Sequence, residues 1–150
     1  MGHTYTQLLT HIVFSTKDRI PYLNDSVRNA VFAYIAGIAR QLRGADVLVN
    51  GAADHAHVFL KMPPVIQTSE AVKKIKANSS KWIHEDRLLS RSFGWQIGYA
   101  AFSVSPSQAA KTIEYIENQE AHHKRISFQE EYLAFLRKHG IPYDERYVWN

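Results

Sequence analysis

Residues 55 to 62, "HAHVFLKM", alternate strictly between two sets of side chains. Successive side chains of a strand point to opposite faces of its sheet. One face of this predicted strand then carries Ala56, Val58, Leu60 and Met62. The other face carries His55, His57, Phe59 and Lys61. The pattern therefore predicts a strand that buries one apolar face and places two imidazoles side by side on the other.

The remaining periodicity predicts an ordered series of strands and helices. Segments rich in β-forming residues predict strands over 5–15 and 46–50 and one or two strands over 93–105, with Gly98 as a candidate bulge. Apolar residues at helical spacing predict helices over 26–42, 69–87, 107–122 and 127–139. The order β-α-β-β-α-β-α-α favours an α+β fold, with a ferredoxin-like or RRM-like split β-α-β antiparallel sheet and additional C-terminal helices.

Two serines are expected to begin the last helices. Ser107 is the predicted N-cap of the third helix, and Ser127 with Glu130 forms a capping box on the fourth. No internal repeat or long linker divides the sequence, so we expect one domain over 1–150.

Composition narrows the function classes. The chain has 150 residues and no cysteine, which excludes disulfides, thiolate zinc sites and cysteine nucleophiles. No apolar run approaches the ~20 residues of a membrane span, and the N-terminus lacks a signal-peptide pattern. We therefore expect a cytoplasmic protein, because a chain without disulfides fits a reducing compartment. A net charge of +4 permits a polyanionic partner.

The third predicted helix carries a second candidate feature. Tyr115 and Gln119 are neighbours at i, i+4, on the side away from the expected buried stripe. That stripe comprises Ala109, Ala110, Ile113 and Ile116. A phenol beside an amide oxygen suits a metal site, and His55 with His57 suits two ligands of one ion. Alternatively, Tyr115 packs on a neighbouring element and the histidines are a strand's polar face.

Together, His55-Ala56-His57 and Tyr115 with Gln119 resemble the HUH-type single-tyrosine transposases of the smallest bacterial insertion sequences and their repeat-associated relatives. The U denotes a hydrophobic residue, which Ala56 provides. The likeness runs from about residue 5 to 125, and 126–150 extends beyond the smallest members. Its further stretches are "HIVFSTKDR" (11–19), "DHAHVFL" (54–60), "IKANSSKWI" (75–83), "GWQIGYAAFSVS" (94–105) and "TIEYIENQ" (112–119).

The resemblance implies specific roles. His55, His57 and Gln119 would bind Mg²⁺ or Mn²⁺, and Tyr115 would attack a phosphodiester of single-stranded DNA. The product would be a 5′-phosphotyrosine and a free 3′-OH, and the reverse attack would rejoin strands. The family also implies a homodimer that binds DNA hairpins near the element ends and needs no small-molecule substrate. Assembly of the active site in cis or in trans stays open.

Several other residues each have two expected roles. Candidate phosphate contacts, equally expected to form a solvated charged surface, are Lys17, Arg19, Lys73, Lys76, Ser80 and Lys81. Asp54 would orient a ligand histidine or simply form a turn. His122 and His123 are expected at a helix end rather than as ligands. The extension 126–150 would cover the sheet, support a dimer or touch DNA, and a stabilising cap is the expected role.

Three alternative functions compete with the transposase. A hairpin-binding regulator of the same family would not need all four residues His55, His57, Tyr115 and Gln119. An RNA-binding sheet would show exposed aromatics where His-Ala-His stands. A two-histidine phosphoesterase would need a second histidine motif on a strand, whereas His122 and His123 are predicted on a helix. We therefore favour a metal-dependent DNA strand transferase.

Overall fold

A computed structural model describes residues 2–150 and contains one antiparallel sheet in the order β2-β3-β1-β4. The strands are β1 (Leu9–Ser15), β2 (Ala45–Ala52), β3 (His55–Lys61) and β4 (Ala100–Ser103). The helices are α1 (Arg28–Gln41), α2 (Thr68–Glu85), α3 (Ala109–Glu117), α4 (Gln119–His122) and α5 (Phe128–Lys138), with short 3-10 turns η1 (Lys17–Arg19) and η2 (Pro106–Gln108). β3 pairs between β1 and β2, so the predicted split β-α-β sheet of an α+β fold is confirmed.

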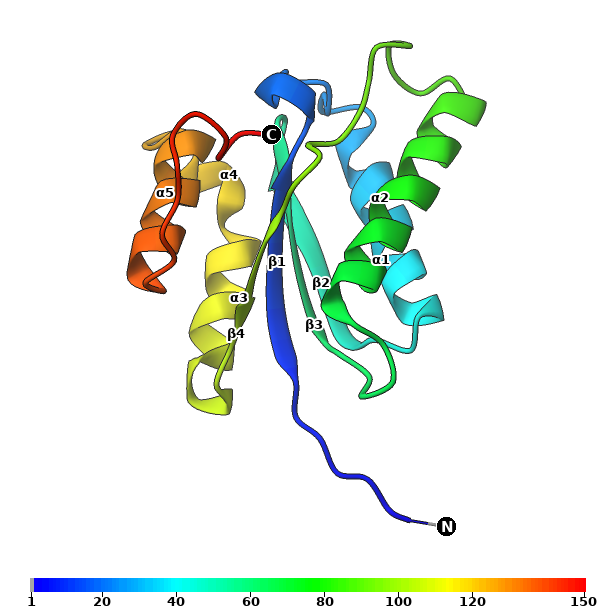
Figure 1. The fold of residues 1–150 in the computed structure, drawn as a ribbon. Coiled ribbons are helices and arrows are strands. Elements are labelled where there is room, and N and C mark those ends of the chain that lie inside the picture. Colours follow the sequence, from blue (N-terminus) through cyan, green and yellow to red (C-terminus); the bar gives the residue numbers. More distant parts are fainter. Residues whose placement is uncertain (1) are drawn as a thin grey trace.

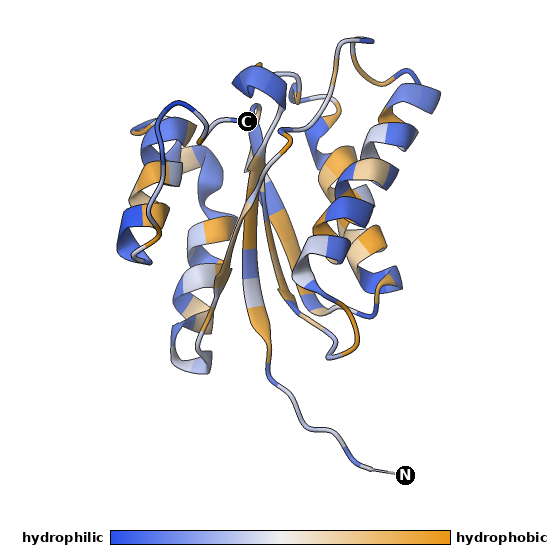
Figure 2. Ribbon diagram, in the orientation of Figure 1, coloured by the Kyte–Doolittle hydropathy of each residue, from blue (hydrophilic) through white to orange (hydrophobic). Residues whose placement is uncertain are grey.

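Helices cover both faces of this sheet. Figure 1 shows α1 and α2 on one side and α3, α4 and α5 on the other. Figure 2 shows apolar residues along the strands and on α1 and α2 beside them, and residues of both pack in one buried cluster. The four residues predicted for the apolar face of the third strand all lie in the largest buried cluster: Ala56, Val58, Leu60 and Met62. Burial of this face against α1 and α2 supplies the main hydrophobic stabilisation.

The opposite face lies against α3 and α5. Phe59 packs with Leu9 and Ile116, one on β1 and the other on α3. Farther along, Val13 and Phe102 pack against three residues of α5, which are Phe128, Tyr132 and Leu136. The helix of the C-terminal extension therefore covers the sheet. It begins at the predicted capping box, in which Ser127 and Glu130 hydrogen-bond reciprocally.

The tight turn between β2 and β3 determines how the two strands pair, and His55 is the first residue of β3. Gly51 pairs with Ala56 in the β2–β3 ladder. A Cβ atom on Gly51 would collide with the His55 carbonyl oxygen, so the hairpin needs a glycine there. This close approach sets the register that brings His55 and His57 to the α3–α5 face.

The segment 93–105 forms less strand than predicted. Only Ala100–Ser103 joins the sheet, while Trp95 makes one isolated bridge to Thr16. The Lys76 ammonium donates to the carbonyls of Gln96, at 2.7 Å, and of Gly98. These carbonyls therefore face α2 instead of a neighbouring strand, which interrupts the ladder. Gly98 is accordingly part of this irregular segment and not a bulge within a strand.

The predicted helix over 107–122 is divided. The 3-10 turn η2 starts it at Pro106, and α3 ends before Asn118, which departs from helical geometry at φ −97° and ψ 23°. Proline favours the first turn of a helix, so the chain turns one residue earlier than predicted. The Ser107 hydroxyl lies 3.1 Å from the Ser105 hydroxyl and caps nothing, so the predicted N-cap is wrong.

Among residues 2–150, no helix has both the length and the apolar character that crossing a membrane requires.

Candidate active site

Three histidines from two adjacent strands form the floor of the site. His55 and His57 on β3 are fully buried, and His11 on β1 is buried beside them. The Nε2 atom of His11 lies 2.7 Å from Nδ1 of His57. Burial lowers the pKa of His11 to about 3, and burial also lowers the pKa of His57. Both rings are therefore neutral near pH 7, and the short contact is one N–H···N hydrogen bond whose direction fixes both tautomers.

Asp54 lies where it can orient the His55 ring, which was one of its two expected roles. Its Oδ1 atom lies 2.8 Å from Nδ1 of His55. The carboxylate accepts the Nδ1–H of His55, which orients the ring and directs Nε2 into the site. That Nε2 atom lies at hydrogen-bond distance, 3.1 Å, from Oε1 of Gln119 and 3.5 Å from Oε1 of Glu131. Three potential ligand atoms therefore meet at this point.

The structure brings Tyr115 and Gln119 to the same place as the two β3 histidines. Gln119 is fully buried, and its amide donates to the Tyr115 carbonyl at 3.3 Å. The rings of Tyr115 and His57 lie 5.9 Å apart. The predicted burial of α3 is partly wrong, because Ala110 is exposed and Tyr115 packs beside Phe59 and Ile116.

A carboxylate that the sequence patterns did not single out lies at the centre of the cluster. Glu131 of α5 is 1% exposed, and every residue that pairs with it carries an imidazole or a phenol. Its Oε1 lies 2.9 Å from His57 Nε2, and its Oε2 lies 3.1 Å from Nε2 of both His122 and His123. Burial opposes its ionisation, but hydrogen bonds from His123 and His57 hold the pKa of Glu131 well below its usual range. Glu131 is therefore an anion inside the site.

The Tyr115 hydroxyl is held in this cluster. It donates to Oε2 of Glu131 and lies 2.9 Å from Nε2 of His122. Burial, together with the negative charge of Glu131, raises the pKa of Tyr115 well above its usual range. The phenol therefore keeps its proton in this arrangement, with Glu131 as its acceptor and the His122 ring within hydrogen-bond distance.

The donor atoms fit a divalent cation. Ligand atoms of His55, His57, His123 and Glu131 all lie within 4.8 Å of one another. Gln119 Oε1 lies 2.9 Å from His123 Nε2 and so borders the same space. Ligands that bind one octahedral ion at about 2.1 Å stand about 3 Å apart when adjacent, close to the separations found here. His123 was expected to be only a helix-end residue, yet it lies within this group.

Sequence signals for these extra residues exist in retrospect. Tyr115, Gln119 and His123 repeat every four residues, which places them along one helical stripe. Glu131 lies between Phe128 and Tyr132 on the apolar stripe of α5, where an acidic residue needs a buried partner. His11 occupies an inward position of β1, opposite Phe59 in the ladder. Each signal becomes specific only when the elements are placed together.

Two hollows open beside Tyr115. A cavity of about 430 Å³ includes Lys111 and Arg125 in its lining, and a cavity of about 610 Å³ includes Lys111 and Lys138. Tyr115 and Lys111 belong to both. His139 and the buried Phe102 line the larger cavity, and their rings stack with centroids 4.2 Å apart. Basic and aromatic side chains therefore flank the phenol, a combination suited to phosphates and bases.

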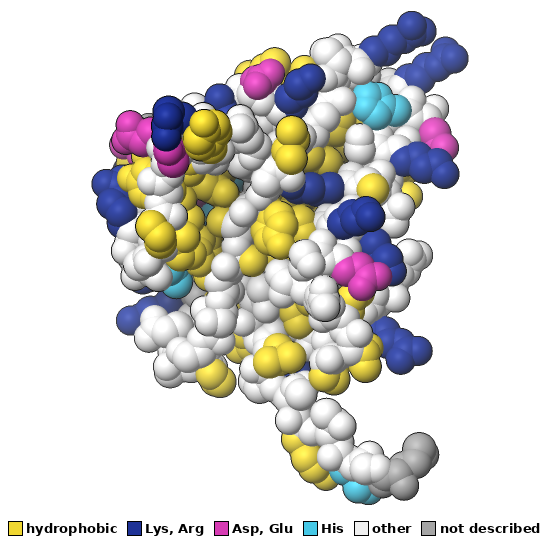
Figure 3. All heavy atoms as spheres, viewed as in Figure 1, with side chains coloured by type: hydrophobic (Ala, Val, Ile, Leu, Met, Phe, Trp, Pro, Cys, Tyr) yellow, Lys and Arg dark blue, Asp and Glu magenta, His cyan; other side chains and the backbone are white. Residues whose placement is uncertain are grey.

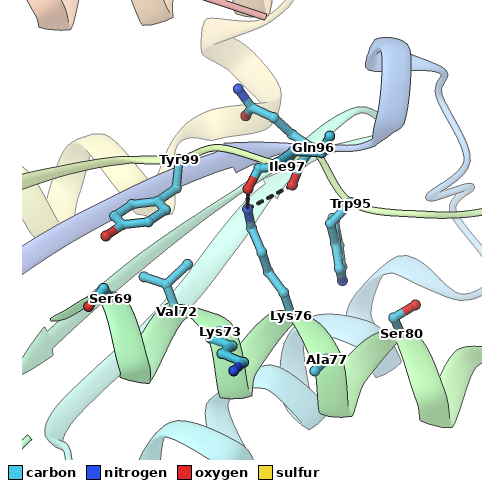
Figure 4. Close-up of a pocket in the computed structure, with 10 residues that line it drawn as sticks. All are labelled: Ser69, Val72, Lys73, Lys76, Ala77, Ser80, Trp95, Gln96, Ile97 and Tyr99. Atoms are coloured by element: carbon cyan, nitrogen blue, oxygen red, sulfur yellow. Dashed lines mark hydrogen bonds between the residues drawn. The ribbon is translucent and has the colours of Figure 1, made fainter. Parts of the chain in front are cut away.

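The candidate phosphate contacts chosen from the sequence lie elsewhere. Lys73, Lys76 and Ser80 line a groove of about 380 Å³ between α2 and the 95–99 segment, on the other side of the sheet from α3 (Figure 4). Figure 3 shows Lys and Arg side chains along the α2 side of the molecule. Lys81 lies 3.8 Å from Glu85, also on α2. The groove includes Ile97, whose side chain is 90% exposed.

Two of these candidates use their charged groups for contacts within the protein, and a third is exposed to solvent. The Lys76 ammonium points inward to backbone carbonyls, and burial lowers its pKa to about 8. The Arg19 guanidinium donates to the Trp149 carbonyl at 3.4 Å and lies 5.2 Å from the centre of its ring. Lys17 is exposed next to Arg19. Lys76 and Arg19 therefore hold parts of the protein together in this structure.

The sequence of this chain is similar to those of known transposases. Residues 4–119 match the model of the family described as "Transposase IS200 like". The transposases of insertion sequence IS200 from Salmonella typhimurium and Salmonella typhi are each 27% identical over 125 residues, covering 79% of this chain and 81% of the relative. His123 and Glu131 lie beyond the matched residues.

Two solved structures share the fold. One, described as a transposase from Deinococcus radiodurans, superposes with a TM-score of 0.62 at 25% identity, covering 79% of this chain and 96% of that one. The other is a REP-associated tyrosine transposase bound to a REP hairpin, with a TM-score of 0.60 at 13% identity and coverage of 84% and 74%. With the family match over residues 4–119, these findings show that the chain belongs to the IS200-like transposase family.

Proposed function

We propose that this protein is a transposase that cleaves and rejoins single-stranded DNA, with Tyr115 as its nucleophile. The observation that carries the proposal is the position of the Tyr115 hydroxyl, bonded to Glu131 in the same buried cluster as His55 and His57. In the proposed step, a bond forms between the phenol oxygen and the phosphorus while the bond from phosphorus to the 3′ oxygen breaks. A 5′-phosphotyrosine and a free 3′-OH result, and the reverse step rejoins the strands.

The phenol must lose its proton to attack. Its hydroxyl already donates to the Glu131 carboxylate and stands 2.9 Å from His122 Nε2, so an acceptor is in place. The raised pKa of Tyr115 means that this transfer costs free energy until the negative charge of Glu131 is compensated. The pKa of Glu131 is held well below its usual range, so this carboxylate is a weak base that positions the phenol. The proposed acceptor of the proton is His122, which would pass it on to the leaving 3′ oxygen.

The proposed cofactor is a divalent ion, Mg²⁺ or Mn²⁺, held by His55, His57 and Gln119. Such an ion, when bound, would polarise the scissile phosphate and stabilise charge in the transition state. Asp54 and His11 orient the two imidazoles through their second nitrogens, at 2.8 and 2.7 Å. The protein therefore presents the Nε2 atoms of both rings to the space beside Tyr115.

The proposed substrate is single-stranded DNA that also carries a hairpin. Lys111, Lys138 and Arg125 flank Tyr115 and would hold the phosphates on either side of the cleaved bond. The solved relative bound to a REP hairpin supports hairpin recognition. The groove beside α2, with Lys73 and Ser80, is the proposed place for it. We propose a homodimer in the cytoplasm as the acting form, as the family resemblance implies.

A covalent-adduct assay tests this function. End-labelled single strands from the DNA flanking the gene are mixed with protein and Mg²⁺ or Mn²⁺ and resolved on a denaturing gel. We expect a labelled protein band that Tyr115→Phe abolishes and that the exposed control Tyr147→Phe retains. His57→Ala should also abolish the metal-dependent band, because it removes a proposed metal ligand. Binding of hairpin DNA on a native gel with no adduct from any strand would favour the alternative, a hairpin-binding regulator derived from the family.

A further inference from the structure

The C-terminal extension delivers a negative charge into the site, although it lies beyond the residues that match the family. We propose that Glu131 is itself a ligand of the divalent cation, so that α5 completes the metal site that His55 and His57 begin. This inference rests on the proposed metal-dependent function and adds a fourth ligand, from a different element, to the His55, His57 and Gln119 set.

The position of Glu131 is fixed by packing. Its neighbours on α5, Phe128 and Tyr132, are buried against Val13 and Phe102 of the sheet. The capping box at Ser127 fixes the start of the same helix. A carboxylate held this firmly loses little conformational entropy when it binds an ion, so the site is preorganised for that ligand.

The charge of Glu131 faces no permanent cation among residues 2–150, where it pairs with no lysine or arginine. All of its ion-pair partners are histidines. An imidazole carries one positive charge at most, and only when it is protonated. A buried anion needs a compensating charge. A divalent cation supplies more positive charge at this position than the imidazoles do.

The Nε2 atoms of both imidazoles converge with Glu131 on the same space. Nδ1 of His55 donates to Asp54, and its Nε2 faces Glu131 Oε1 at 3.5 Å. Nδ1 of His57 lies 2.7 Å from His11, and its Nε2 hydrogen-bonds to the same Glu131 oxygen at 2.9 Å. A bound cation would take the place of the proton between His57 and Glu131, with Nδ1–H of His57 then donating to His11. Two imidazole nitrogens and a carboxylate oxygen therefore border one space that a cation can occupy.

Glu131 also determines which metals the site prefers. Two imidazoles and an amide form a nitrogen-rich neutral set, which favours later transition metals in the Irving–Williams order. An added carboxylate oxygen makes the set anionic and harder, which favours Mn²⁺ and Mg²⁺. The proposal therefore predicts a metal preference as well as an affinity, and a merely structural Glu131 would not alter that preference.

The test measures metal binding without DNA. Mn²⁺ and Co²⁺ affinities are determined by calorimetry, with Mn²⁺ paramagnetic resonance as a second readout, for the wild-type protein, Glu131→Gln, Glu131→Asp and the exposed control Glu120→Gln. We expect Glu131→Gln to weaken Mn²⁺ binding by at least about tenfold and Co²⁺ binding by clearly less. Glu131→Asp keeps the carboxylate and should keep the wild-type preference at reduced affinity. Glu120→Gln should match the wild type.

The outcomes separate this inference from the proposed function. If Glu131→Gln folds, as judged by circular dichroism, and binds both metals as the wild type does while His57→Ala binds neither, Glu131 is not a ligand and the histidine site stands. Equal weakening of both metals by Glu131→Gln also overturns the inference, because it indicates a structural role. If His57→Ala binds metal normally, the metal site itself is misplaced. If Glu131→Gln does not fold, Glu131→Asp serves as the test. Loss of the wild-type ratio of Mn²⁺ to Co²⁺ affinity in Glu131→Asp, which keeps the carboxylate, would overturn the inference.

Discussion

The two faces of β3 are buried to the same extent but built in opposite ways. Ala56, Val58 and Leu60 face α1 and α2, and His55 and His57 face α3 to α5, each with 1% exposure or less. The first face is stabilised by burial of apolar surface, which is non-directional. The second is stabilised only if every nitrogen and oxygen has a partner, since an unpaired buried polar group is costly.

This difference shows where the molecule carries its chemistry. Within residues 2–150, no buried side-chain nitrogen or oxygen lacks a hydrogen-bond partner, so the polar face is satisfied even without an ion. That satisfaction depends on Glu131, which contacts His57, His123 and Tyr115 at once. The apolar face needs only side chains of suitable volume, whereas the polar face depends on specific partners from several elements, with Glu131 of α5 at their centre.

The largest expected effect on stability lies on the apolar face. Leu60→Ala removes a fully buried side chain from the α1–α2 core and should lower the free energy of unfolding by about 2–5 kcal/mol, as measured by urea denaturation. Metal affinity of the folded fraction should be unchanged, because Leu60 faces away from the histidines. Loss of metal affinity in proportion to stability would show that the two faces are not independent.

The sequence predicted the apolar face well for physical reasons. The alternation in β3 and the helical stripes of α1 and α2 are local patterns, and each is read from residues a few positions apart. The strand predicted over 93–105 is too long, because its interruption depends on Lys76, 20 residues before Gln96. The Lys76 ammonium binds the carbonyls of Gln96 and Gly98 and so turns them toward α2. The split near Asn118 likewise reflects contacts made after folding, not a glycine or proline at that position.

The next prediction concerns the polar face as a ligand site. A divalent ion that binds only the folded state should raise the free energy of unfolding by about 2.7 kcal/mol at a concentration one hundred times its dissociation constant. Thermal unfolding with and without Mn²⁺ measures this increment. Leu60→Ala should show the same increment on a lower baseline, and His57→Ala should show none. An equal increment in His57→Ala would place the ion elsewhere.

A smaller effect is expected from the histidine that orients His57. His11→Phe keeps a ring on β1 but removes the hydrogen-bond partner of His57 Nδ1, so metal affinity should fall by about 10- to 100-fold. Calorimetry with Mn²⁺ measures this change. His139→Phe is the matched control, since His139 stacks on Phe102 and its ring nitrogen pairs with the Phe135 carbonyl outside the cluster. Equal losses in both variants would indicate a general effect of aromatic packing.

The candidate site was predictable only in part, and the reason lies in distance along the chain. His55, His57, Tyr115 and Gln119 belong to short motifs, so their spacing along the chain is enough to select them. His11 and Glu131 belong to no such motif, because they reach the site through the β1–β3 pairing and through the docking of α5. A buried carboxylate becomes recognisable only when the histidines around it are placed in space, which spacing in the sequence cannot do.

The smallest expected effect tests how firmly α5 presents Glu131 to the polar face. Ser127→Ala breaks the capping box at the start of α5 and should cost about 1 kcal/mol of stability. Because the lost bonds lie one turn before Glu131, hydrogen exchange should quicken in α5 while α1 and α2 stay protected. Metal affinity should fall slightly, as Glu131 samples more positions. The exposed Ser107, which caps no helix, provides the control, and Ser107→Ala should change neither quantity. Faster exchange in α5 with unchanged metal affinity would mean that the ion does not depend on Glu131, and the polar face would then be complete without the extension.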